Sequence, residues 1–127
     1  MDKRILIIDD EEVIRKIFIL ALEDTGYIVD TADYGEKGVE LVAQQKYDLI
    51  FLDMNMPGIN GLETLRKIRK IDKQVVVYFV TAFYGIFFDE LDRAQKDGLR
   101  FEVLKKPVGM AQIEMLARSV LEGSIER

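Results

Sequence analysis

Residues 48–58 read DLIFLDMNMPG, and this stretch decides the fold of the chain. Its apolar run, Leu49–Leu52, has the length of a strand and is soon followed by a Pro-Gly turn signal. A short apolar run without alternation is typical of a strand buried on both faces of a parallel sheet. Asp53 comes where the run stops. Its carboxylate is therefore expected at the carboxyl edge of the sheet, where open α/β folds bind ligands.

Outward from this strand, strand-like segments alternate with helical segments along the chain. Strands are expected at Arg4–Ile8, Tyr27–Thr31, Asp48–Asp53, Val75–Val80 and Phe101–Lys105. Helices are expected at about Glu12–Asp24, Tyr34–Gln45, Leu62–Ile71, Tyr84–Asp97 and Gly109–Glu122. Such alternation implies right-handed βαβ crossovers and a doubly wound parallel sheet with helices on both faces. Residues 1–127 contain no linker-like or repetitive segment, so we expect a single domain.

The composition disfavours or excludes several classes of function. The chain has 23 acidic and 18 basic residues and a net charge of −5, which disfavours direct binding to nucleic acid. It has no Cys and no His, which excludes thiol chemistry, ordinary zinc sites and a histidine base. We find no apolar run of membrane-spanning length and no signal peptide. We therefore expect a cytoplasmic protein without membrane or nucleic-acid partners.

Side chains with complementary chemistry follow four of the five expected strands. They are Asp9 and Asp10, Asp53, Thr81, and Lys106. Because parallel strands end at the same edge of a sheet, we expect these five side chains to lie together. Converging carboxylates repel one another unless a cation lies between them, and hard oxygen ligands suit Mg²⁺. The hydroxyl and the ammonium complement a phosphoryl group, so the pattern predicts Mg²⁺-assisted phosphoryl chemistry on a carboxylate nucleophile.

Each of these residues also has a simpler explanation. Asp9 and Asp10 could merely favour the N-terminus of the next helix, and Asp53 could cap the turn after its strand. Thr81 could be only a β-branched residue at a strand end, and Lys106 only a solvated cation. The functional interpretation depends on the conjunction, because four separate strand ends carry the required chemical types.

Four segments resemble the receiver domains of bacterial two-component response regulators. They are ILIIDDE at residues 5–11, DLIFLDMNMPGING at 48–61, VTA at 80–82 and KP at 106–107. The resemblance covers essentially the whole chain. It implies a flavodoxin-like fold, a doubly wound parallel sheet of five strands in the order 2-1-3-4-5 with five helices.

The resemblance implies roles for the acidic residues. Asp53 would accept a phosphoryl group from a phospho-His on a sensor histidine kinase or phosphotransfer protein. Asp10 and Asp53 would bind Mg²⁺ directly, and Asp9 would act mainly through a metal-bound water. Asn55 would offer its backbone carbonyl to the same ion. The chain would catalyse only its own phosphorylation and dephosphorylation, so we expect a signalling switch and not an enzyme.

The resemblance also implies how the switch would work. Lys106 would pair with a phosphoryl oxygen, and its bond to Pro107 would be cis. Thr81 would move to hydrogen-bond the phosphate, biasing a face made by the fourth helix, fifth strand and fifth helix toward an output partner or homodimer. Receivers commonly carry an aromatic residue three positions before this Lys, where the chain has Val103. Phe101 has the same strand parity and is the other candidate for the aromatic switch.

The first expected helix is apolar around most of its circumference. One apolar stripe is enough to cover the sheet, so the excess indicates a second stripe that faces a partner. Ile14, Phe18 and Ala21 are the candidates for docking to the kinase. The alternative is a helix that its neighbours bury more deeply.

Residues 83–88, FYGIFF, are unusually apolar for the start of the fourth helix. Phe87 is expected in the core with Leu91 and Ala94, and the remainder could form an exposed interaction patch or a larger core. Phe83 is close in sequence to Thr81. We expect it to restrict water access to the phosphoryl group and so to slow autodephosphorylation.

Three other functions fit parts of the pattern. A Mg²⁺-dependent phosphohydrolase of the haloacid-dehalogenase type also uses an Asp nucleophile. It would need a second acid at the position of Asn55, and its nucleophile would follow the first strand. A flavodoxin would need a phosphate-binding loop where the chain has acidic residues 9–12. A receiver-like interaction module that acts without phosphorylation stays open because of Val103.

Overall fold

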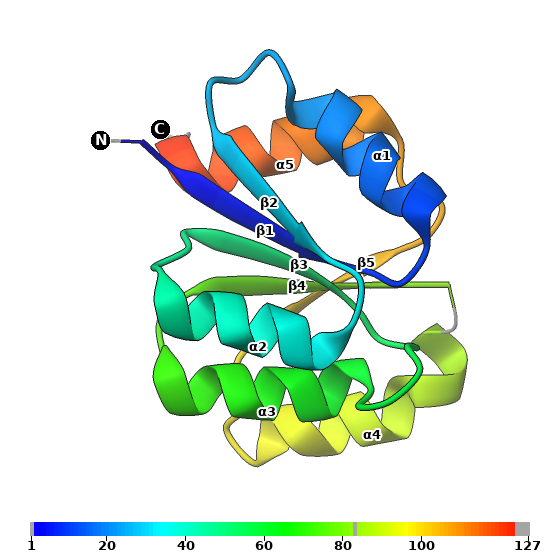
Figure 1. Ribbon diagram of the computed structural model, residues 1–127. Helices are drawn as coiled ribbons and strands as arrows, with labels where there is room; N and C mark the ends of the chain where they lie inside the picture. The colour runs from blue at the N-terminus through cyan, green and yellow to red at the C-terminus, as the bar shows by residue number, and fades with distance from the viewer. Residues whose placement is uncertain (1, 83, 124–127) are drawn as a thin grey trace.

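The computed structural model describes residues 2–82 and 84–123, in which five strands alternate with five helices (Figure 1). Phe83, and with it the expected control of water access, lies outside the described residues. In chain order the elements are β1 (Arg4–Ile8), α1 (Glu12–Leu22), β2 (Ile28–Ala32), α2 (Gly35–Gln44), β3 (Leu49–Asp53), α3 (Gly61–Ile71), β4 (Val76–Thr81), α4 (Tyr84–Lys96), β5 (Glu102–Lys105) and α5 (Met110–Glu122).

The strands form one parallel sheet in the order β2-β1-β3-β4-β5. Helices α1 and α5 cover one face, and α2, α3 and α4 cover the other (Figure 1). This confirms the doubly wound, flavodoxin-like fold that the sequence predicts. All five residues of β3 are buried because helices cover both faces of this central strand, which explains its unbroken apolar run.

Two hydrophobic cores lie on opposite faces of the sheet because successive strand residues point to opposite sides. Ile7 and Phe51 pack in the core under α1 and α5. Ile8 and Leu52 pack in the core under α2, α3 and α4. Each such side chain stabilises the fold by about 1.5–3 kcal/mol through its burial. The polar residues that follow these strands are thereby held on a rigid edge.

Phe18 is a core residue, and the expectation that it faces a partner is wrong. Its side chain is 2% exposed, and its ring lies 4.8 Å from that of Phe51, centroid to centroid. Ile14 and Ala21 are partly buried against the same cluster. Helix α1 packs on α5 as well as on the sheet, so a wider stripe of the helix is buried than a sheet contact alone requires.

Apolar residues of α4 divide between the core and the surface. Phe87 packs with the buried Leu91 and Ala94 in one core, as predicted. Ile86 and Phe88 are exposed. The segment therefore supplies both core packing and an apolar surface, and neither alternative accounts for all of it.

Helix α1 ends two residues earlier than the sequence pattern indicates. The hydroxyl and the backbone N–H of Thr25 both bond to the carbonyl of Leu22, at 2.6 Å and 3.2 Å. Gly26 then adopts a φ of +82°, which a residue with a side chain rarely adopts. The chain can therefore turn sharply into β2.

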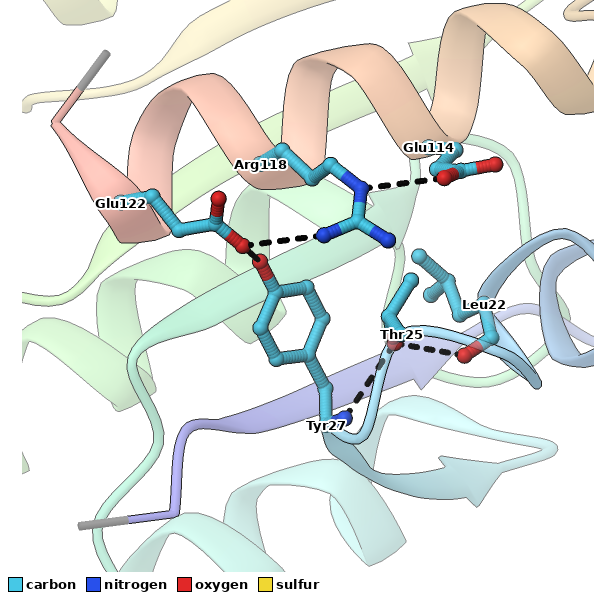
Figure 2. Close-up of polar contacts among 6 residues, drawn as sticks. All are labelled: Leu22, Thr25, Tyr27, Glu114, Arg118 and Glu122. Carbon is cyan, nitrogen blue, oxygen red and sulfur yellow. Dashed lines mark hydrogen bonds and ion pairs between the residues drawn. The ribbon is translucent and has the colours of Figure 1, made fainter.

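A polar clasp joins the start of β2 to the end of α5 (Figure 2). The hydroxyl of Tyr27 donates a hydrogen bond to the Glu122 carboxylate. Arg118 forms ion pairs with both Glu114 and Glu122, at 3.0 Å and 3.2 Å. Partial burial, followed by the bond to Glu122, raises the pKa of Tyr27 to about 12. The clasp thus fixes the last turn of α5 against the edge of the molecule.

We expect Tyr27→Phe to lower the free energy of unfolding by about 0.5–1 kcal/mol, because the bond is largely exposed to solvent. The difference should be present below pH 10 and should vanish as the pH rises through about 12, where the folded-state hydroxyl loses its proton. Urea unfolding at several pH values measures both effects. Tyr34→Phe is the control, because within the described part of the chain no hydrogen bond involves the Tyr34 hydroxyl. Equal stabilities of Tyr27→Phe and the wild type would contradict the clasp.

Candidate functional site

The sheet brings the strand-end residues to its carboxyl edge. Asp9 follows β1, Asp53 ends β3, Thr81 ends β4 and Lys106 follows β5, so their order across the sheet matches the order of the strands. A pocket at this edge has a volume of about 360 Å³ and is lined by Asp10, Glu11, Asp53, Asn55, Ala82 and Lys106. Asp9 and Thr81 are buried beside it and are not among its lining residues. The pocket lies at the carboxyl edge of the sheet, where the sequence predicts a ligand site.

Three carboxylates converge in this pocket. One oxygen each from Asp9, Asp10 and Asp53 lies within 4.8 Å of the others. The side chains of Asp9 and Asp53 are nearly buried, whereas Asp10 is exposed. Buried like charges are unfavourable unless a cation compensates them. An all-oxygen donor set of this charge fits a hard divalent cation, so the acids could bind a metal ion.

Lys106 supplies the positive charge in the pocket. Its Nζ lies 3.4 Å from Asp9 Oδ2, 3.5 Å from Asp53 Oδ1 and 3.6 Å from Glu11 Oε1. The backbone N–H of Lys106 donates to the Thr81 carbonyl at 2.8 Å, which aligns the end of β5 with β4. The Lys106–Pro107 peptide bond is cis. The ammonium is therefore held between the carboxylates, although the chain separates these residues widely.

Burial and mutual repulsion shift the titration of the acids. Burial, followed by the charge of Asp9, raises the pKa of Asp53 to about 7. Burial also raises the pKa of Asp9, although the backbone N–H of Glu11 and the ammonium of Lys106 counteract it. Burial lowers the pKa of Lys106, but the neighbouring carboxylates raise it more, so its pKa lies above the ordinary value. Without a bound cation, the pocket is thus short of positive charge.

The turn after β3 holds Asp53 in place. Gly61, the first residue of α3, donates its N–H to the Met54 carbonyl at 2.9 Å. A Cβ on Gly61 would lie 2.5 Å from the backbone oxygen of Asp53, so only glycine allows this close approach. Asn60 and Glu63 form a capping box that starts α3 next to this contact.

Two further residues touch the site although the sequence reasoning did not single them out. The Arg15 guanidinium donates to the Asp9 carbonyl at 2.8 Å. Glu11 contributes a carboxylate near Lys106, and its backbone N–H donates to Asp9 Oδ1 at 2.9 Å. The sequence does offer one indication of the Arg15 contact, because Arg15 lies in the first turns of α1, only six residues beyond Asp9. A helix that starts at the sheet edge turns its first residues back over that edge.

A family model for the response regulator receiver domain matches residues 5–118. The chain belongs to the receiver domain family. This confirms the resemblance and identifies the chain as a response regulator receiver domain of two-component systems. Its carboxyl-edge pocket is the place where the family motifs of the sequence meet.

Relatives of this receiver domain include regulators of different lengths. It is 44% identical over 78 residues to the transcriptional regulatory protein YkoG of Bacillus subtilis, covering 61% of this chain and 34% of that protein. It is 31% identical over 105 residues to the receiver protein CpdR of Brucella abortus, covering 83% of this chain and 85% of that protein. The chain thus spans about a third of some relatives and most of others.

Solved structures show the same fold. A receiver domain protein from Methanospirillum hungatei superimposes with a TM-score of 0.85 at 24% identity, over 97% of this chain and 96% of that one. The chemotaxis protein CheY4 of Vibrio cholerae superimposes with a TM-score of 0.82 at 24% identity, over 95% and 100% of the two chains. Among the described residues, no helix combines the length and apolarity needed to cross a membrane.

The candidate switch residues of this receiver domain lie on the side of the sheet covered by α4. Thr81 is buried at the end of β4. Phe101, just before β5, is buried with its ring 5.0 Å from that of Phe79 in an edge-to-face contact. Val103 is partly buried against the same core. Both switch candidates therefore share one face, in agreement with their strand parity.

Proposed function

We propose that this receiver domain is a phosphorylation-activated signalling switch. Asp53 accepts a phosphoryl group from a phospho-His of a sensor histidine kinase or phosphotransfer protein, in a Mg²⁺-dependent reaction. One observation carries this proposal: Lys106 Nζ lies 3.5 Å from Asp53 Oδ1 in the pocket that also holds the oxygens of Asp9 and Asp10. A nucleophile, a cation for the phosphoryl oxygens and a metal ligand set are thus in one place.

Each residue of the pocket has a role in this reaction. Asp53, as its carboxylate, attacks the phosphorus, and the phospho-His imidazole leaves. Asp9, Asp10, Asp53 and the backbone carbonyl of Asn55 would hold Mg²⁺, which supplies charge neutralisation to the phosphoryl oxygens. Lys106 then exchanges its carboxylate contacts for a phosphoryl oxygen. The domain modifies only itself, so we expect no turnover of other substrates.

Phosphorylation would change the face formed by α4, β5 and α5. A phosphoryl group adds about 1.5–2 negative charges and strong acceptor oxygens beside Thr81. A hydrogen bond from Thr81 to these oxygens moves the β4–α4 loop. The space beside the buried Phe101 and the partly buried Val103 changes with this movement. The exposed Ile86 and Phe88 lie on α4, so this shift would alter an apolar surface suited to an output partner or a second copy.

The kinase would dock beside the pocket. Val13 and Leu20 are seven residues apart on α1, and their side chains are 68% and 54% exposed. This spacing puts both on one helix face, and they replace the buried Phe18 as the apolar docking candidates. The alternative function, an interaction module that works without phosphorylation, is favoured only by Val103, which cannot act as an aromatic switch.

Incubation with Mg²⁺ and acetyl phosphate tests the proposal. We expect intact-mass spectrometry to show one added phosphoryl group on the wild type, and none when EDTA replaces Mg²⁺ or when the variant is Asp53→Asn. Asp24→Asn removes an exposed acid at the end of α1 and should be phosphorylated like the wild type. Modification of Asp53→Asn to the wild-type extent, or no modification of the wild type, would refute the proposal. Repeated release of phosphate from other phosphate esters would instead support a phosphohydrolase.

A further inference from the structure

The signalling function leaves one basic region of the molecule unused. Residues 66–73 at the end of α3 read RKIRKIDK, and Arg100 lies in the connection between α4 and β5. Both segments lie at the amino edge of the sheet, opposite the phosphorylation pocket (Figure 1). This end of an acidic protein thus carries a cluster of basic residues, with Asp72 and Glu102 among them.

Arg69 is fixed in this region by neutral acceptors. One guanidinium nitrogen donates to the Val75 carbonyl at 2.7 Å and to the Asp72 carbonyl at 3.3 Å. The other donates to the Arg100 carbonyl at 2.7 Å. Its Nε is buried and has no hydrogen-bond partner among the residues that the structure describes. Arg69 is therefore held rigidly by neutral acceptors.

No carboxylate of the described residues forms an ion pair with the cations of this region. Within residues 2–82 and 84–123, no carboxylate oxygen lies within 4.0 Å of a side-chain nitrogen of Arg69, Lys73 or Arg100. The Asp72 carboxylate is engaged instead by the backbone N–H groups of residues 74 and 75. Burial, and then the charge of Arg100, lowers the pKa of Arg69, although the charge of the Asp72 carboxylate opposes this shift. The two guanidinium groups thus lie close enough to repel each other, and Asp72 offsets that repulsion only in part.

These cations line a cavity. A pocket of about 340 Å³ is bordered by Arg69, Lys73, Gln74, Gly98, Leu99 and Arg100. A second pocket of about 110 Å³ shares Arg69, Gln74 and Arg100, and its one acidic lining residue is Glu102. The volume of the larger pocket is near the lower end of the range for small-molecule sites, so it suits a small ligand.

We propose that this cavity binds a small, multiply charged oxyanion of the diphosphate class. Three cations that form no ion pair with a described carboxylate line it, whereas a single carboxylate would neutralise only one of them. Arg69 contributes a fixed positive charge. Arg100 contributes a guanidinium that makes no hydrogen bond within the described part of the chain, a group that suits phosphate-type oxygens. The flexible Lys73 adds a mobile cation at the rim, and Gln74 adds an amide that can donate to a further oxygen. The ligand would bridge α3 and the α4–β5 connection.

Titration of the ¹⁵N-labelled protein with inorganic pyrophosphate tests this site. EDTA and constant ionic strength remove Mg²⁺ binding and general screening as causes of any shift. We expect saturable amide shifts in residues 69–75 and 98–102. Arg100→Gln and Lys73→Gln should each weaken binding about tenfold, because each removes a charged donor. Arg69 is left unchanged because its loss would also break the three backbone contacts.

Lys67→Gln is the matched control, because Lys67 is an exposed cation of the same helix that does not line the cavity. It should bind pyrophosphate like the wild type. Shifts that do not saturate, or equal affinities of all three variants, would overturn the site. Asp53→Asn should also bind normally, so a failure of the phosphorylation proposal and a failure of this site are distinguishable.

Discussion

Asp53→Asn is expected to raise the free energy of unfolding of the metal-free protein by about 2 kcal/mol at pH 8. The wild type must keep a buried carboxylate ionised there, beside Asp9, although the pKa of Asp53 is raised to about 7. A shift of about 3 units sets an upper bound of about 4 kcal/mol. The loss of the Lys106 contact reduces that gain. The amide keeps the size of the side chain and removes its charge.

The pH dependence provides a second measure of the same effect. The folded state binds the Asp53 proton more tightly than the unfolded state, whose pKa is near the ordinary 3.8. The free energy of unfolding of the wild type should therefore fall as the pH rises from about 4 to about 7 and level off above it. Asp53→Asn should show a flatter profile in the same buffers. Urea unfolding in EDTA at pH 5 and pH 8 measures both profiles.

Saturating Mg²⁺ should reverse the order of stability of the wild type and Asp53→Asn. A ligand that binds only the folded state stabilises it by RT ln(1 + [L]/Kd), or about 2.7 kcal/mol at one hundred times Kd. The wild type should gain more from saturating Mg²⁺ than Asp53→Asn, which lacks one carboxylate ligand. Asp24→Asn should respond to pH and Mg²⁺ like the wild type. If Asp53→Asn were less stable than the wild type in EDTA at pH 8, the electrostatic account of the pocket would be wrong.

Gly61→Ala is expected to lower the free energy of unfolding by about 3 kcal/mol or more. The added Cβ would lie 2.5 Å from the Asp53 carbonyl oxygen and 2.7 Å from the Met54 Cα. Both contacts are with backbone, so the start of α3 and the end of β3 must separate, and such strain is costly. Because the displaced residue carries the Asp53 carboxylate of the acidic cluster, Mg²⁺ binding should weaken as well. Thermal unfolding with and without Mg²⁺ measures the two effects.

Gly85→Ala is the matched control for this clash. A Cβ on Gly85, in the first turn of α4, would meet no heavy atom of the described residues within 4 Å outside its chain neighbours and the backbone of its own helix, and alanine favours a helix. Its stability should equal or slightly exceed that of the wild type. If Gly61→Ala were as stable as the wild type, the β3–α3 turn would adapt to the added Cβ without cost, contrary to the packing described above.

The sequence alone was sufficient to predict the fold. The alternation of apolar runs with helical segments defined a parallel sheet, and the uniformly apolar residues 49–52 identified a central strand. The chemistry of Asp9, Asp53, Thr81 and Lys106 could be grouped before any coordinates, because parallel strands all end at one edge. That inference needs no side-chain detail, since the rule depends only on strand direction.

Helix orientation could not be predicted in the same way. Phe18 was assigned to a partner surface, but α5 packs on α1 and widens its buried stripe. An apolar residue looks the same in the sequence whether a core or a partner covers it. The rotation of a helix about its axis is set by all its neighbours and not by its own pattern.

The sequence by itself thus determined the order of the elements and the main acidic, hydroxyl and ammonium groups at the carboxyl edge of the sheet. Only the tertiary structure decided the supporting contacts: Gly61 against Asp53, Arg15 on the Asp9 carbonyl, and Tyr27 on Glu122. It also decided that Arg69 is held by backbone carbonyls, with a buried Nε that has no hydrogen-bond partner among the described residues. Sheet-edge residues are brought together by the direction of the strands, which a local pattern encodes. These other contacts depend on distances between elements far apart in the chain, which no local pattern encodes.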